Sequence, residues 1–274
     1  MTRKLFIVFL AAVLCGCEVI REEDRLIPMA IVNGERVHVL VEYTGFRCVN
    51  CPEAAETAEA LQALYGGQFV VVAMHPATNT FTQGAYDYTC PEADICYRGM
   101  GGTATTPFPT GNIDMKETDG SFFLDRQQWA SALLTAMKDD EAPYLHATAT
   151  ADSTGGITVK IQTQALQETE ARMALWVTED SILGAQVMGD GTNNLSYYHR
   201  HVLRDALMDE PFGWEVTIGA EEQERTYRYT LPDGCNAAQC RFIALILDKN
   251  DKHILQAYET KLDDSSLAAG DNRR

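Results

Sequence analysis

Two cysteines three positions apart offer the clearest chemistry in this sequence. The run Cys48-Val49-Asn50-Cys51 follows an apolar segment at 37–43, which predicts a buried strand, and precedes a predicted helix at 52–65. A thiolate at the start of a helix is stabilised by unpaired backbone N–H groups, which lower its pKa and make it nucleophilic. The order of strand, CxxC and helix therefore predicts thiol–disulfide exchange, with Cys48 attacking and Cys51 resolving.

Two other interpretations of this pair stay open. A static disulfide in a redox-type fold has the same sequence pattern, because fold does not fix function. A zinc site would need two more soft ligands nearby, and the sequence has no second CxxC. We predict neither a metal nor a cofactor.

The N-terminal segment has the order of an export signal. Arg3 and Lys4 precede an apolar run at 5–14, which is too short to span a bilayer and ends in Cys15-Gly16-Cys17. These last residues resemble the lipobox of bacterial lipoproteins. The resemblance implies a signal peptide at 1–16, lipidation of Cys17 and attachment to a membrane, and the charged residues at 17–28 are typical of a tether.

The remaining cysteines fall into two close pairs. Export places the chain in an oxidising compartment, where disulfides persist. Short separations favour local closure, so we expect structural bridges between Cys90 and Cys96 and between Cys235 and Cys240.

The charge of the chain narrows the class of partner. The net charge of −17 argues against nucleic acid as a partner, because the chain repels phosphate backbones. Attachment to a membrane must then come from acyl chains at Cys17 rather than from a basic patch.

The hydrophobic pattern changes near residues 139–143. Strands alternate with helices at 29–140, which predicts a small α/β domain, whereas 141–262 reads as short strands of period two. Such strands, separated by turn signals, predict an all-β immunoglobulin-like sandwich. Residues 263–274 form a polar tail.

The first domain resembles the thioredoxin superfamily. In that fold a cis-proline faces the CxxC, and Phe108-Pro109-Thr110 resembles the element that carries it. The resemblance implies that Pro109 lies against both cysteines and shapes a groove for a substrate peptide. Arg47 stands where the superfamily usually has a tryptophan, and its positive charge favours a thiolate.

A second resemblance covers almost the whole mature chain. It rests on residues 41–45 before the CxxC, residues 108–112 and residues 198–204. These resemble a family of outer-membrane lipoproteins, named for a protein of about twenty-eight kilodaltons, that join a thioredoxin-like domain to a β-sandwich. The resemblance implies that the protein is located in the outer membrane. The resemblance is also compatible with a second function, in which the lipoprotein binds an envelope or extracellular protein and its CxxC forms a structural disulfide.

Two histidines in the second domain have the spacing of metal ligands. His199 and His201 would share one face of a predicted strand at 197–203. No third ligand is evident, so we favour a packing role for both.

Overall fold

The computed structural model describes residues 36–139, 141–152 and 154–263. The predicted signal peptide, Cys17, the tether and nearly all of the polar tail lie outside the described residues. Within the described ranges, no helix combines the length and apolar character needed to cross a bilayer.

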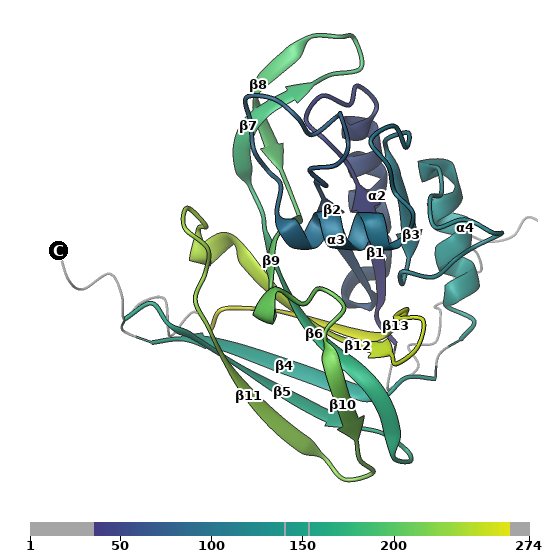
Figure 1. The fold of residues 1–274 in the computed structure, drawn as a ribbon, viewed down its shortest axis with the longest axis vertical. Coiled ribbons are helices and arrows are strands. Elements are labelled where there is room, and N and C mark those ends of the chain that lie inside the picture. Colours follow the sequence, from purple (N-terminus) through teal and green to yellow (C-terminus); the bar gives the residue numbers. More distant parts are fainter. Residues whose placement is uncertain (1–35, 140, 153, 264–274) are drawn as a thin grey trace, which may run out of the picture. The chain divides into compact units, whose positions relative to one another are not determined.

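The largest sheet of the described residues has eight strands and draws on both halves of the chain (Figure 1). Its order is β13–β12–β6–β9–β2–β1–β3, and β10 pairs with β6. β1 and β2 are parallel, whereas β3 is antiparallel to β1, so the sheet is mixed. Its strands are β1 (His38–Tyr43), β2 (Phe69–Met74), β3 (Thr110–Ile113), β6 (Thr169–Glu179), β9 (Val202–Ala206), β10 (Trp214–Ile218), β12 (Cys240–Asp248) and β13 (Ile254–Lys261).

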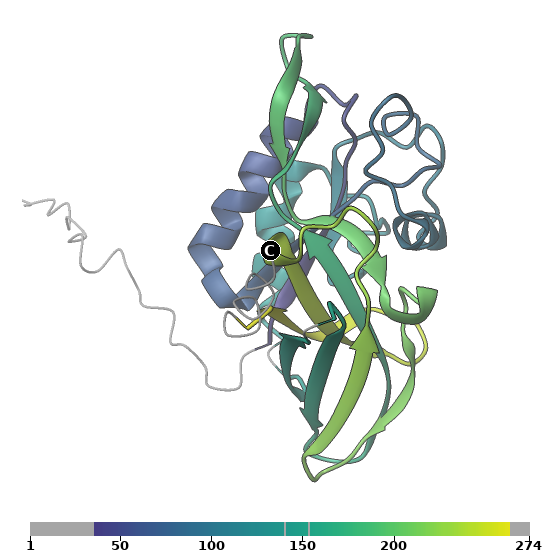
Figure 2. The same cartoon turned by 90° about the vertical axis from the view of Figure 1, so that its left-hand side faces the viewer.

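Helices cover both faces of the β1–β2 region. Figure 2 shows α2 on one side of the sheet and α3 on the other. Trp129 and Leu133 of α4 are buried with Leu40 of β1 and Ala58 of α2 in one apolar cluster. This explains why β1 and β2 read as nearly continuous apolar runs. The helices are α2 (Cys51–Tyr65), α3 (Pro91–Gly99), α4 (Arg126–Ala136), η1 (Gly66–Gln68), η2 (Leu207–Asp209) and η3 (Ala237–Gln239).

A second β layer packs on the C-terminal half of the large sheet. Its strands, in the order β11–β5–β4, are β4 (Tyr144–Ala151), β5 (Ile157–Gln164) and β11 (Gln223–Tyr229). Along β5, buried residues alternate with more exposed ones, as expected when one face meets a core and the other meets water. The fold is therefore mixed α/β and rich in strands.

A hairpin of β7 (Ile182–Val187) and β8 (Asn193–His199) leaves the large sheet and lies beside α2 (Figures 1 and 2). The predicted single strand at 197–203 is therefore wrong. The chain turns at Arg200 and His201, where His201 has φ 54°, because β8 pairs with β7 while β9 joins β6 and β2.

The two predicted domains are joined through this sheet. Ala73 of β2 pairs with Val202 of β9, so a strand of each predicted domain meets the other. The division into 29–140 and 141–262 stays a prediction. The sequence pattern predicted no helix between residues 75 and 102, where the structure has α3.

Candidate redox site around Cys48 and Cys51

Cys48 and Cys51 lie where the end of β1 leads into α2. They form a disulfide, and their Cα atoms are 5.4 Å apart. The Cys48 N–H donates to the Gly45 carbonyl (3.0 Å), which closes the turn that leaves β1. α2 begins at Cys51, and Pro52 follows in the first turn, where a missing N–H costs nothing. The pair thus lies between a buried strand and a helix N-terminus.

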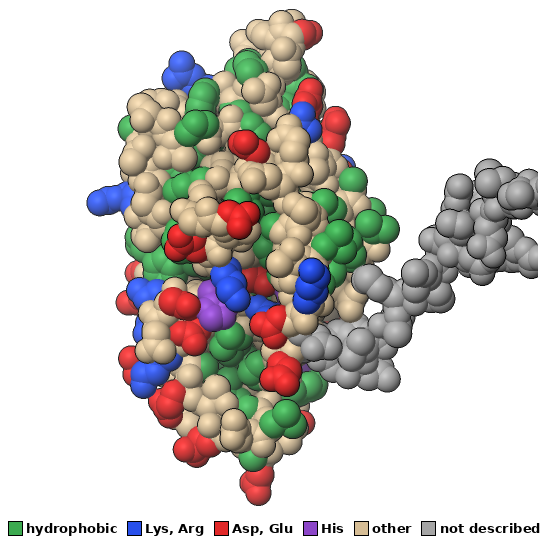
Figure 3. Space-filling model, turned by 90° about the vertical axis from the view of Figure 1, so that its right-hand side faces the viewer, with side chains coloured by type: hydrophobic (Ala, Val, Ile, Leu, Met, Phe, Trp, Pro, Cys, Tyr) green, Lys and Arg blue, Asp and Glu red, His purple; other side chains and the backbone are tan. Residues whose placement is uncertain are grey.

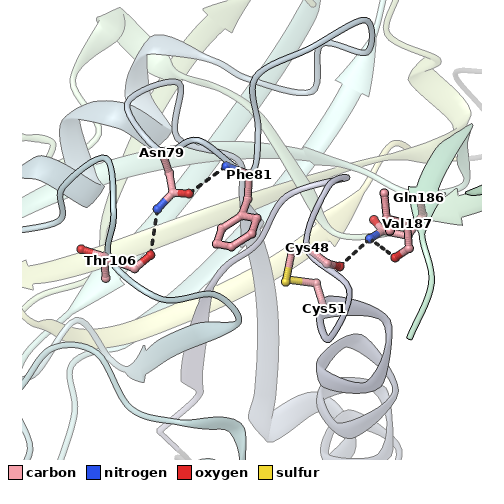
Figure 4. Close-up of a disulfide and its surroundings, with 7 residues drawn as sticks. All are labelled: Cys48, Cys51, Asn79, Phe81, Thr106, Gln186 and Val187. Carbon is pink, nitrogen blue, oxygen red and sulfur yellow. Dashed lines mark hydrogen bonds between the residues drawn. A yellow bond between two sulfur atoms is a disulfide. The ribbon is translucent and has the colours of Figure 1, made fainter. Parts of the chain in front are cut away.

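Both cysteines are covered by other segments. Only 1% of Cys48 and 2% of Cys51 is exposed. The amide of Gln186, on β7, donates to the Cys48 carbonyl (2.9 Å), and the ring of Phe81 lies near the sulfurs (Figure 4). The Arg47 N–H donates to the Phe81 carbonyl (3.1 Å). A substrate sulfur can reach the disulfide only when a covering segment moves.

The loop that carries Phe81 is fixed by a buried amide. The side chain of Asn79 donates to the Tyr97 hydroxyl (2.9 Å) and to the Thr106 carbonyl (3.0 Å). Its oxygen accepts from the Phe81 N–H (3.0 Å; Figure 4). Asn79 and Phe81 cannot be recognised from the sequence, because an amide and a ring within a long connection form no motif.

Pro109 lies at the sheet edge from which the cysteine loop departs. The Phe108–Pro109 peptide bond is cis, and the next residue, Thr110, pairs with Tyr43 at the end of β1. The Phe108 ring stacks on Phe81, with centroids 5.9 Å apart. The proline turn and the loop over the disulfide therefore contact each other.

Glu42 is a buried carboxyl that the sequence analysis missed. It lies on β1 with 2% of its surface exposed, and its Oε1 has no hydrogen-bond partner among the described residues. Burial, and to a smaller extent the charge of Glu59, raises the pKa of Glu42 to about 8. Glu42 and Cys51 line the same small cavity. The feature of the sequence that could have identified Glu42 is its position as an acidic residue within the apolar run at 37–43.

The structure separates the two histidines that were predicted to share a strand face. His199 is the last residue of β8, whereas His201 lies in the turn after it. Nδ1 of His201 is 3.4 Å from Oδ1 of Asp180. His199 instead meets His75, which follows β2, with ring centroids 5.9 Å apart. Burial lowers the pKa of His75 to about 3 and that of His199 to about 4. Both imidazoles are therefore neutral near pH 7.

The other cysteines differ from expectation. Cys90, Cys96, Cys235 and Cys240 are free thiols in the structure, so neither predicted bridge is formed. Cys90 caps α3 and Cys96 lies six residues on, which is about 9 Å of helical rise and beyond the reach of a disulfide. Cys235 and Cys240 are hydrogen-bonded neighbours, which lowers the pKa of Cys235. Their oxidation to a bridge stays a prediction.

Two groups of side chains away from the disulfide have the spacing of metal ligands. They are Asp248, Asp251 and His253, and Glu92, Asp205 and Asp209. In the first group His253 already binds Asp251 (2.5 Å), and in the second Asp205 accepts from the Tyr229 hydroxyl (2.5 Å). Neither group belongs to the candidate redox site.

Comparison with known proteins decides the family. The family model for outer membrane protein Omp28 matches residues 103–266, which is more than half of the chain. The chain belongs to the Omp28 family. Its location is accordingly the outer membrane of the cell envelope. No curated protein matches the chain.

Two solved structures with TM-scores above 0.5 show a similar fold at low identity. HBP35 of Porphyromonas gingivalis is 18% identical with a TM-score of 0.65, and the match covers 84% of this chain and 76% of that one. A protein of Agrobacterium tumefaciens is 15% identical with a TM-score of 0.51, over 88% of this chain and 97% of its own. A domain of Omp28 from P. gingivalis is 16% identical with a TM-score of 0.31, over 44% of this chain and 88% of that domain.

Proposed function

We propose that this Omp28-family protein is an outer-membrane lipoprotein whose thioredoxin-like domain exchanges thiols and disulfides through Cys48 and Cys51. One observation carries the proposal: Cys51, of the cysteine pair at the start of a helix, lines the same cavity as the buried residue Glu42. The order of β1, cysteine pair, α2, β2, cis-proline and β3 supports the thioredoxin-like assignment. The second β layer supports an immunoglobulin-like domain. Lipidation of Cys17 is part of the proposal.

The reduced pair would act in two steps. The Cys48 thiolate attacks a substrate disulfide, forms a mixed disulfide and releases one substrate thiolate. Cys51 then gives its proton to the Glu42 carboxylate, attacks the Cys48 sulfur and releases the second substrate thiolate. The Cys48–Cys51 disulfide forms as the substrate disulfide is reduced. In this proposal Pro109 positions the substrate peptide.

An insulin-reduction assay with dithiothreitol tests this proposal. We expect the wild-type protein to accelerate insulin reduction, and Cys48→Ser to abolish the acceleration because the attacking sulfur is lost. Cys235→Ser is the matched control, since this thiol lies outside the site, and it should keep the wild-type rate. Equal rates for the wild type and Cys48→Ser would contradict the proposal.

Burial of both cysteines favours a second candidate, in which the disulfide is a structural staple of a lipoprotein that binds an envelope or extracellular protein. Acidic side chains are scattered over the face in Figure 3 and lie beside Lys and Arg side chains in its middle. A protein partner is compatible with such a mixed surface. Copurification of a partner with the wild type and with the Cys48→Ser/Cys51→Ser variant tests it. A binder keeps its partner when both sulfurs are replaced and the chain still folds.

A further inference from the structure

The cavity beside Cys51 contains buried polar atoms that lack a hydrogen-bond partner in the described structure. Its volume is about 30 Å³, and its lining includes Glu42, His75, Tyr197 and His199. Oε1 of Glu42 and Nδ1 of His75 are both buried and unpaired. Such atoms normally find a partner, and a polar cavity of this size has room for one or two waters. The two unpaired atoms therefore point to a bridging water.

The two histidines of this cavity can pass a proton without holding a charge. Nε2 of His199 is 3.1 Å from the Ala185 carbonyl. A carbonyl only accepts, so this nitrogen carries the hydrogen and Nδ1 of His199 is an acceptor. His75 is also neutral near pH 7 and has one donor and one acceptor nitrogen. The cavity thus contains both kinds of group that a proton transfer needs.

The cavity has a polar exit. Glu59 and Arg200 line both this cavity and a neighbouring open groove of about 490 Å³. They form an ion pair of 3.2 Å, with 41% of the Glu59 side chain and 53% of the Arg200 side chain exposed. These are the charged groups that face Glu42 from α2 and from the end of β8. Among the other groups that line the cavity, burial lowers the pKa of His75, His199 and His201 and raises that of Tyr197, so all four are neutral near pH 7.

We propose that His75 is a positioning residue through which Glu42 exchanges its proton with solvent, by way of cavity water and the exit at Glu59 and Arg200. The inference rests on the proposed thiol–disulfide exchange, in which Cys51–SH and Glu42–COO⁻ become Cys51–S⁻ and Glu42–COOH. Glu42–COOH must then return its proton to water before the next cycle. His75 orients the water that accepts this proton, and no other reactant is consumed.

Titration of Glu42 in the full chain tests the link without any substrate. The carboxyl signal is followed by carbon-13 NMR on glutamate-labelled protein and assigned by its loss in Glu42→Gln. We expect His75→Leu to raise the Glu42 midpoint by about one unit, because the carboxylate loses a polar partner. His75→Gln should return the midpoint most of the way. The control His146→Leu, on β4 against Tyr258, should leave it unchanged.

Reduction of the disulfide by dithiothreitol in H₂O and D₂O gives a second readout. We expect His75→Leu to slow reduction about tenfold and to enlarge the solvent isotope effect. Should His75→Leu fail to fold by circular dichroism, His75→Ala provides the same comparison. If His75→Leu leaves the Glu42 midpoint unchanged, the inference is overturned and the proposed exchange still stands. The same holds if dithiothreitol reduces the wild-type disulfide but His75→Leu changes neither the rate nor the isotope effect. If the wild-type disulfide resists reduction while the midpoint still follows His75, the proposed exchange fails and the Glu42–His75 link stands.

Discussion

Glu42 is the residue on which the proposed chemistry of this site depends most. Burial raises the pKa of the carboxyl to about 8, so near pH 7 the protonated form predominates and a minor fraction is the carboxylate that can accept the Cys51 proton. Arg47 lies nearby in sequence, yet its guanidinium is exposed and donates to the Gln83 carbonyl (3.2 Å). The expected effect of Arg47 on a Cys48 thiolate therefore stays a prediction.

Replacing Glu42 by glutamine should change how stability depends on pH. An unfolded glutamate releases its proton near pH 4.5, whereas the folded chain keeps it to about pH 8. Folding stability contributed by this group is therefore lost as pH rises through that window. At pH 8, Glu42→Gln should be more stable than the wild type by roughly 4 kcal/mol, and this difference should fall to about 1 kcal/mol at pH 5.

Urea unfolding at pH 5 and pH 8 measures this difference in free energy of unfolding. Glu56→Gln is the matched control, because Glu56 is an exposed glutamate on α2. It should keep the wild-type pH dependence. The same pH dependence in the wild type and in Glu42→Gln would show that the carboxyl titrates normally.

At the scale of elements, the disulfide is covered by segments from both halves of the chain. The loop held by Asn79 carries Phe81, which packs against the apolar cluster that contains both cysteines, and the β7–β8 hairpin contributes Gln186. The Val187 N–H also donates to the Phe46 carbonyl (2.8 Å), which ties the hairpin to the cysteine loop. Access to the sulfurs is thus decided by how readily these connections open.

Removing the ring of Phe81 should make the disulfide easier to reduce. We expect Phe81→Ala to increase the rate of reduction by dithiothreitol roughly tenfold, because local opening then exposes the sulfurs at lower cost. Release of free thiol measures the rate. Phe212→Ala is the control, since Phe212 is also half-buried and packs against Lys252 instead. A rate equal to that of the control would show that Phe81 does not limit access.

At the scale of the whole molecule, one apolar cluster is shared by both predicted domains. Val41 and Tyr97 from the first half are buried with Trp176, Leu203 and Leu245 from the second half. The indole N–H of Trp176 donates to the Pro211 carbonyl (2.7 Å), so this ring is fixed by the second half itself. The cysteine-bearing half therefore has its apolar surface covered by strands of the other half.

A fragment of residues 29–140 should not fold alone. Without β6, β9 and β12, the apolar side chains that they cover would be exposed to water. This exposure costs a free energy of about 25 cal/mol for each Å² of apolar surface. We expect a poorly dispersed proton–nitrogen NMR spectrum, in contrast to that of residues 29–262. A well-dispersed spectrum of the fragment would instead support two independent domains, as the hydrophobic pattern predicts.

The sequence alone predicted the parts of the fold that depend on local pattern. The apolar run of β1, the proline at the start of α2 and the alternating strands β4 and β5 are properties of neighbouring residues. They located the cysteine pair between a strand and a helix, and the resemblance to outer-membrane lipoproteins agreed with the family match.

Only the tertiary structure decided how accessible and how charged the site is. Gln186 reaches Cys48 across 138 positions, and His75 meets His199 across more than a hundred, so no local periodicity carries either contact. The same holds for the turn at His201, because the partners of β8 and β9 come from different sheets. Burial, cavities and shifted pKa values arise from such distant contacts, which a pattern of neighbours does not specify.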